Sequence, residues 1–141
     1  MLADSATDRS GLENYKMITI KGRLQQGVGD FRKRMTKFPD VFRSATGETL
    51  FPGTLNVKVE RKIPAKEDFR IRGIDIDDPN QDLLFERCLI NGIPGYRIRP
   101  FNLKHGGGGH GDDVIELSSS QQIPYTRDGA VVEITFFRES L

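Results

Sequence analysis

The chain has 141 residues, of which 36% are hydrophobic and 29% are charged, and this length allows one domain with a real core. Its 21 Lys and Arg residues nearly balance its 20 Asp and Glu residues, and the net charge of +1 gives no general argument for nucleic acid or an anionic membrane as a partner, so neither is expected. No apolar run approaches the ~20 residues of a membrane span. The single cysteine, Cys88, is expected to be a buried, unreactive thiol in a reducing cytoplasm.

The first predicted strand follows a polar N-terminal segment. Residues 1–14 show neither periodicity nor a signal-peptide core, so we expect a mobile tail before a domain that spans residues 15–141. From residue 17 to residue 24, apolar residues alternate with polar ones, which predicts a strand. One face of this strand would hold Ile18, Ile20, Gly22 and Leu24.

A glycine loop and a basic run follow this strand. Gly27, Val28 and Gly29 precede Arg32-Lys33-Arg34. Glycine lets backbone N–H groups approach an anion closely, and the cations add charge, so the segment is a candidate phosphate site. Glycines also end strands, and the basic run could be solvated surface. The segment is neither a P-loop nor a Rossmann fingerprint, since GxxxxGK[ST] is absent and no helix is predicted after it with GxGxxG spacing.

Helix signals are scarce in the sequence. The best candidate runs from Pro39 to about Ala45, with proline in the first turn and Gly47 just past the end.

Residues 52–59 read Pro-Gly-Thr-Leu-Asn-Val-Lys-Val, which predicts a tight turn followed by a strand. Leu55 would share the buried face with two valines, while Thr54 and Asn56 point to the other face, roughly 7 Å apart at ~3.3 Å per residue. A hydroxyl and an amide oxygen can contact a Mg²⁺ ion that takes its other ligands from water and substrate phosphates. The alternative is a half-buried strand with ordinary polar residues outward.

The remaining alternating segments predict further short strands. They cover residues 69–76, with a bulge or bend at Gly73, and residues 114–117 and 130–137. Residues 84–90 and 95–98 flank Asn91-Gly92, which is a strong hairpin signal. Six or seven short strands without βαβ spacing predict a mainly all-β, antiparallel or Greek-key barrel with one or two short helices.

The two histidines, His105 and His110, flank four glycines. Zn²⁺ sites need three or four ligands on rigid elements, so a mobile lid is favoured over a metal site. Glu116 lies between two apolar strand residues and should face away from them, either into a cleft or into solvent. The sequence offers no Ser-His-Asp or Cys-His constellation for nucleophilic catalysis.

Taken in order, these segments resemble the archaeal CTP-dependent riboflavin kinases. The likeness runs from about residue 16 to residue 137, and its most specific part is the Gly-Thr-Leu-Asn-Val stretch after a GxG loop. The other matching segments are the opening strand over 18–22, a Phe- and Pro-rich segment, the hairpin over 88–92, the strand from His110 to Leu117, and residues 128–134.

The resemblance implies a six-stranded cradle-loop barrel that transfers the γ-phosphoryl group of CTP to the 5′-hydroxyl of riboflavin, giving FMN. Thr54 and Asn56 would hold Mg²⁺, and Glu116 and His110 would contact the flavin. No general base is identified. The nucleotide-binding residues would be Gly27, Val28, Gly29, Asp30, Phe31, Gln121, Gln122 and Ile123.

The chain departs from the family pattern in three places, one of which is that the flavin-contacting Thr before the His falls within the four glycines. The nucleotide loop lacks the last glycine of Gly-Glu-Gly and is about two residues shorter, and a residue with a Cβ there narrows the space for phosphate. A Lys-Leu-Arg stretch is replaced by residues 121–124, Gln-Gln-Ile-Pro. Two functions therefore stay open: a kinase acting on a nucleoside triphosphate and riboflavin, or a non-catalytic module on the same barrel that binds a nucleotide, a flavin or a protein partner. Oligomeric state is not indicated by the sequence.

Overall fold

The computed structural model of the protein describes residues 15–27, 30–104 and 113–139. The predicted tail over residues 1–14, the loop residues Val28 and Gly29, and the segment with His105 and His110 lie outside the described residues. No helix in the described ranges is long and apolar enough to cross a membrane.

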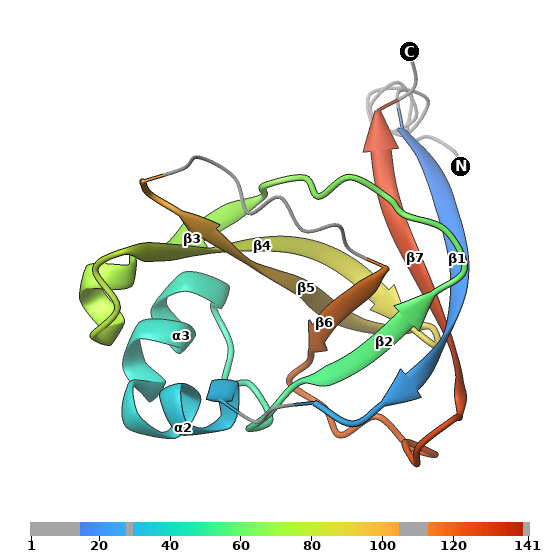
Figure 1. Cartoon of the computed structure of the whole chain (residues 1–141), viewed down its shortest axis with the longest axis horizontal. Helices are drawn as coiled ribbons and strands as arrows, with labels where there is room; N and C mark the ends of the chain where they lie inside the picture. Colours follow the sequence, from blue (N-terminus) through green and yellow to red (C-terminus); the bar gives the residue numbers. More distant parts are fainter. Residues whose placement is uncertain (1–14, 28–29, 105–112, 140–141) are drawn as a thin grey trace, which may run out of the picture.

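The strands in the described part of the chain form one antiparallel sheet in the order β3-β4-β5-β6-β2-β1-β7 (Figure 1). Because β4 also pairs with β7, six strands close into a barrel, and β3 pairs with the other half of β4. This confirms the predicted mainly all-β barrel. The strands are β1 Tyr15–Gln25, β2 Leu55–Val59, β3 Phe69–Ile71, β4 Gln81–Ile90, β5 Ile93–Asn102, β6 Val114–Ser118 and β7 Val131–Glu139.

Within the described residues, two helices and one 3₁₀ turn stand beside the barrel: α2 Asp30–Lys37, α3 Pro39–Thr46 and η1 Gly73–Ile76. The prediction of α3 is confirmed, and Gly47 ends it with φ +80°. The sequence analysis missed α2, which follows the glycine loop directly. It also extended a strand through residues 72–76, where the chain instead forms η1.

Two apolar clusters form the core. The first fills the barrel with residues from five of its strands, and Cys88 lies in it as a free thiol whose pKa is raised by burial, as predicted. The second packs α2, α3 and η1 against β3, β4 and β5, and its largest members are Phe31, Met35, Phe42, Phe85 and Tyr96. This second cluster holds α2 beside the start of β2 (Figure 1).

A buried ion cluster links β4, β5 and β7 to the long connection between β2 and β3. Glu86 and Arg97 are paired across β4 and β5 and are 2% and 4% exposed. Arg138 Nη2 lies 2.9 Å from Glu86 Oε2. The connection between β2 and β3 is hydrogen-bonded to both members of this pair. Arg97 donates to the Ile63 carbonyl at 2.7 Å, and Lys66 N–H donates to Glu86 Oε1 at 3.1 Å.

The β4–β5 hairpin has the two-residue turn that the sequence predicts. Asn91 and Gly92 both have positive φ, +50° and +80°, which is the type I′ geometry whose twist matches the flanking strands. The strands pair without interruption from Ile90↔Ile93 outward, and Pro94 is accommodated within β5.

We expect Gly92→Ala to lower the free energy of unfolding by about 1–2 kcal/mol, because an L-residue is disfavoured in the left-handed region. A Cβ at position 92 would meet no atom within 4 Å, so the cost is conformational and not steric. Urea denaturation measures it, with Asn91→Gly as the control that keeps the turn accessible. An unchanged midpoint for Gly92→Ala would contradict the type I′ assignment.

Candidate functional site

Three residues that the sequence analysis singled out lie together on one face of the barrel wall. Thr54 comes just before β2, Asn56 is the second residue of β2, and Glu116 is on β6. Asn56 and Glu116 are directly opposite each other across the antiparallel β2–β6 pair, so their side chains share a face. Thr54 Oγ1 lies 3.0 Å from Glu116 Oε2 and donates a hydrogen bond to it. Val57 is the next residue along β2 after Asn56, and its side chain points to the opposite face, where it is fully buried.

The loop after β1 packs directly on the Asn56 amide. A Cβ at Gly27 would lie 1.9 Å from Asn56 Nδ2 and 2.7 Å from its Cγ. A Cβ at position 27 would therefore force the Asn56 side chain to shift. The predicted glycine loop and the predicted metal pair meet here.

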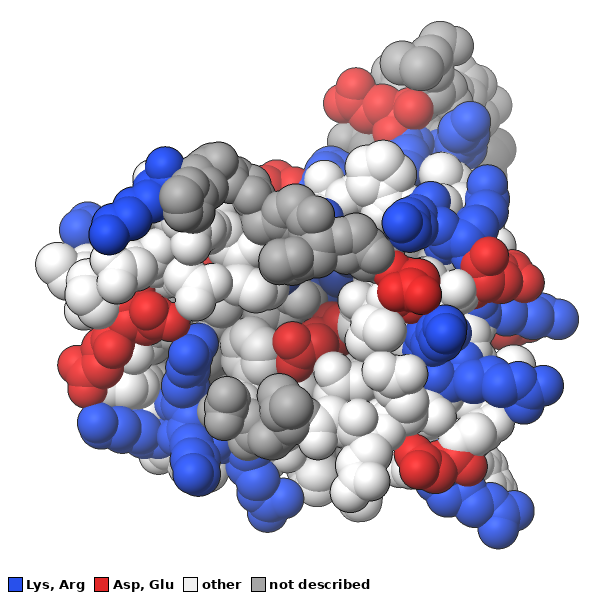
Figure 2. Space-filling model, viewed as in Figure 1, with Lys and Arg blue, Asp and Glu red and all other residues white. Residues whose placement is uncertain are grey.

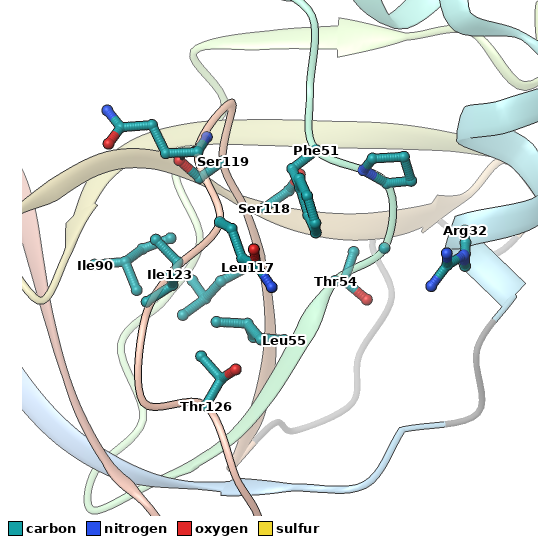
Figure 3. Close-up of a pocket in the computed structure, with 14 residues that line it drawn as sticks. Arg32, Phe51, Thr54, Leu55, Ile90, Leu117, Ser118, Ser119, Ile123 and Thr126 are labelled. Atoms are coloured by element: carbon teal, nitrogen blue, oxygen red, sulfur yellow. Dashed lines mark hydrogen bonds between the residues drawn. The ribbon is translucent and has the colours of Figure 1, made fainter.

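Two hollows that share part of their walls lie beside Gly27, Thr54 and Asn56. The first has a volume of about 250 Å³ and is lined by Gly27, Arg32, Gly53, Thr54 and Asn56. The second, about 200 Å³, shares Arg32, Gly53 and Thr54 with the first (Figure 3). Its remaining wall is formed by Phe51, Pro52, Leu55, Ile90, Leu117, Ser118, Ser119, Gln121, Gln122, Ile123 and Thr126.

The loop that follows β6 is fixed to the hairpin by one serine. Ser119 Oγ donates to the Pro94 carbonyl at 2.8 Å and accepts from Gln121 N–H at 3.1 Å. These bonds hold Gln121, Gln122 and Ile123 against the second hollow, where the resemblance predicts nucleotide contacts.

The other predicted nucleotide residues have different positions. Phe31 is 8% exposed and packs in the second apolar cluster, so it is a core residue of α2 and is absent from the described walls of both hollows. Asp30 begins α2. Val28, Gly29 and His110 are not among the described residues.

Arg32 belongs to the basic run that was predicted to add charge beside the glycine loop, but it was not among the predicted nucleotide-binding residues. It lines both hollows because α2 is tied to the turn before β2, where Gly53 N–H donates to Met35 Sδ at 3.3 Å. Phe31 and Met35 are four residues apart, which is the spacing of one face of a helix, and both are buried. This spacing is the sequence signal that would have predicted the helix and placed Arg32 away from its apolar face.

The donor chemistry of the site fits a hard cation. Thr54 offers a hydroxyl oxygen, Asn56 an amide oxygen and Glu116 a carboxylate. Among the described residues, no group of three or more His, Cys, Asp and Glu side chains could hold a metal ion. One carboxylate with neutral oxygens is typical of Mg²⁺ that shares its coordination with water and substrate phosphates.

Comparison with known proteins gives one informative likeness. No protein-family model matches the chain. The chain is 26% identical over 133 residues to a curated riboflavin kinase of Staphylothermus marinus, and the match covers 86% of this chain and 94% of that protein. The likeness therefore extends over most of this chain and nearly the whole length of that protein.

Proposed function

We propose that this chain, a divergent member of the riboflavin kinase family, transfers a phosphoryl group from a nucleoside triphosphate to riboflavin and so produces FMN. The similarity to the Staphylothermus marinus riboflavin kinase and the closed six-stranded barrel support this. The observation that carries the proposal is the contact between Thr54 and Glu116 beside Asn56, at hollows large enough for parts of a nucleotide.

Each side chain of this group has a role in the proposed reaction. Thr54 and Asn56 would hold Mg²⁺, which when bound supplies neutralisation of phosphate charge. Glu116, whose carboxylate accepts from Thr54, would contact the flavin and so bring the acceptor hydroxyl to the ion-binding face. Phosphoryl transfer depends on positioning and charge neutralisation more than on covalent chemistry, which suits a site without a nucleophile. By resemblance, CTP is the expected donor.

A non-catalytic module that binds a nucleotide or flavin is the second candidate. Two observations favour it. Phe31, predicted for the nucleotide loop, is packed into the core, and the segment after β6 offers Gln121 and Gln122 where cations were expected. The two candidates share the same site and differ in turnover.

Turnover of riboflavin tests the proposal. The full chain is incubated with riboflavin, Mg²⁺ and each of CTP, ATP, GTP and UTP, and FMN is measured by chromatography with fluorescence detection. We expect FMN with at least one nucleotide, CTP first, and loss of activity with EDTA. A shift of the melting temperature by nucleotide or flavin without FMN would instead favour the binding module. Neither turnover nor binding would reject both candidates.

We expect Asn56→Ala to lower FMN formation by at least ~10-fold, since even outer-shell partners of a metal site cost about 10–100-fold. The fold should survive, because Asn56 is only half-buried on the polar face of β2. Lys58→Ala is the matched control: this residue lies two positions along the same face and is exposed, and among the described residues its side chain has one ion pair, with Asp113 at the surface at 4.0 Å. Equal activity of the two variants would remove Asn56 from the site.

A further inference from the structure

The two hollows, together called the groove below, share part of their walls and differ in chemistry at their far ends. They share Arg32, Gly53 and Thr54. One end is lined by Leu55, Ile123 and neutral polar side chains of the loop after β6 (Figure 3). The other end is lined by Gly27 and Asn56. A ligand that spans the groove must pass the shared residues.

At the uncharged end of the groove, a buried hydroxyl without a partner indicates a polar ligand. Ser118 is 3% exposed, lines the hollow, and its Oγ has no hydrogen-bond partner among the described residues. A buried hydroxyl without a partner is costly, and a polar ring substituent of a ligand would satisfy it. A heterocyclic base with polar edges fits this end, which leaves the shared middle to whatever is attached to the base.

The charge in the middle of the groove comes from Arg32. It is the charged residue among the described walls of both hollows. Lys and Arg side chains gather over α2 and α3 on the face seen in Figure 2. Arg34 and Lys37, however, are engaged by Asp78 at 3.2 Å and by Asp77 at 3.0 Å. Within the described ranges, no ion pair or hydrogen bond joins the Arg32 guanidinium to another residue, while the backbone carbonyl of Arg32 accepts a hydrogen bond from Thr36 Oγ1 at 2.9 Å.

We propose that Arg32 binds the phosphate chain of the nucleotide and supplies the positive charge that the loop over residues 121–124 lacks. This inference rests on the proposed function. A guanidinium matches phosphate oxygens with two parallel N–H donors, and its position beside Thr54 brings those donors next to the ion-binding face. The order base, phosphates and ion then follows the groove from Ile123 to Asn56, and Glu116 lies opposite Asn56 across the β2–β6 pair.

Steady-state kinetics separate phosphate binding from a structural role. We expect Arg32→Ala to raise KM for the nucleotide about 10–100-fold, the range for a lost hydrogen bond to a charged group, while KM for riboflavin stays unchanged. Arg32→Lys should recover part of this loss, because it keeps the charge without the fork. Lys33→Ala is the control, since it removes a neighbouring exposed cation of α2 that is absent from the described walls of both hollows.

A binding measurement keeps this inference distinct from the proposed function. Inorganic tripolyphosphate with Mg²⁺ is titrated calorimetrically into wild type, Arg32→Ala and Lys33→Ala. We expect binding to wild type and Lys33→Ala, and about 10-fold or greater loss in Arg32→Ala. If tripolyphosphate binds in this pattern but no FMN is formed, the role of Arg32 in phosphate binding is upheld and the proposed kinase activity is rejected. FMN formation with an unchanged nucleotide KM in Arg32→Ala, or no binding of tripolyphosphate by wild type, would overturn the role of Arg32.

Discussion

Gly27→Ala is expected to lower FMN formation about 100-fold with the barrel intact, because misplacing a positioning group by about 1 Å can cost that much. The added Cβ would lie 1.9 Å from Asn56 Nδ2, so the amide must leave its position. Asn56 faces the hollow and not the core, which means that the displacement affects the proposed ion-binding pair more than the stability of the protein.

A second substitution shows whether the effect of Gly27→Ala passes through Asn56. Residues in contact give non-additive effects, so Gly27→Ala combined with Asn56→Ala should be no less active than Asn56→Ala alone. Gly47→Ala is the control: it also replaces a glycine, here at φ +80°, but a Cβ there meets no atom within 4 Å. It should leave FMN formation unchanged. Independent, multiplying effects of the Gly27 and Asn56 substitutions would contradict the proposed contact.

The local pattern of the chain predicted the face of β2 correctly, and the reason is geometric. Alternation in a strand fixes which side chains share a face, so Thr54 and Asn56 could be grouped from their spacing alone. Their contact with Glu116 depends on β2 pairing with β6 in one register, across a sequence separation of 62 residues. No local pattern encodes such a pairing, and the family resemblance was needed to connect the two segments.

The helix α2 was harder to predict because its sequence is mostly charged. Only Phe31 and Met35 mark its apolar face, and both are buried by tertiary packing against β3, β4 and β5. Helices of this kind owe their stability to packing more than to propensity. Without α2, the basic run did not show which of its three cations would line the groove, because the position of Arg32 follows from where the helix docks.

Glu86→Ala is expected to lower the free energy of unfolding by about 3–5 kcal/mol, the usual cost of breaking a buried ion pair. Arg97 is 4% exposed and would lose its paired carboxylate, and Lys66 N–H would lose its acceptor. Glu86→Gln keeps the shape and one acceptor oxygen, so its cost should be smaller. Urea denaturation is the appropriate measurement, because guanidinium is ionic and screens charge.

An exposed glutamate provides the control for Glu86. Glu133→Ala removes a carboxylate from a surface position of β7, and surface changes of this kind usually stay within about 0.5 kcal/mol. A loss for Glu86→Ala no greater than that of Glu133→Ala would show that the buried cluster contributes nothing to stability.

The pH dependence of the same variants tests the balance inside the cluster. Burial raises the pKa of Glu86 above its ordinary value of 4.5, even though Arg138 and Arg97 oppose the shift. The folded protein therefore holds this proton more tightly than the unfolded chain does. Stability from Glu86 is fully present below pH 4.5 and is lost as pH rises through the folded pKa. Because Glu86→Gln does not titrate there, the free energy of unfolding of wild type should fall relative to that of Glu86→Gln as pH rises. The opposite trend would mean that the arginines, and not desolvation, dominate the pKa of this carboxyl.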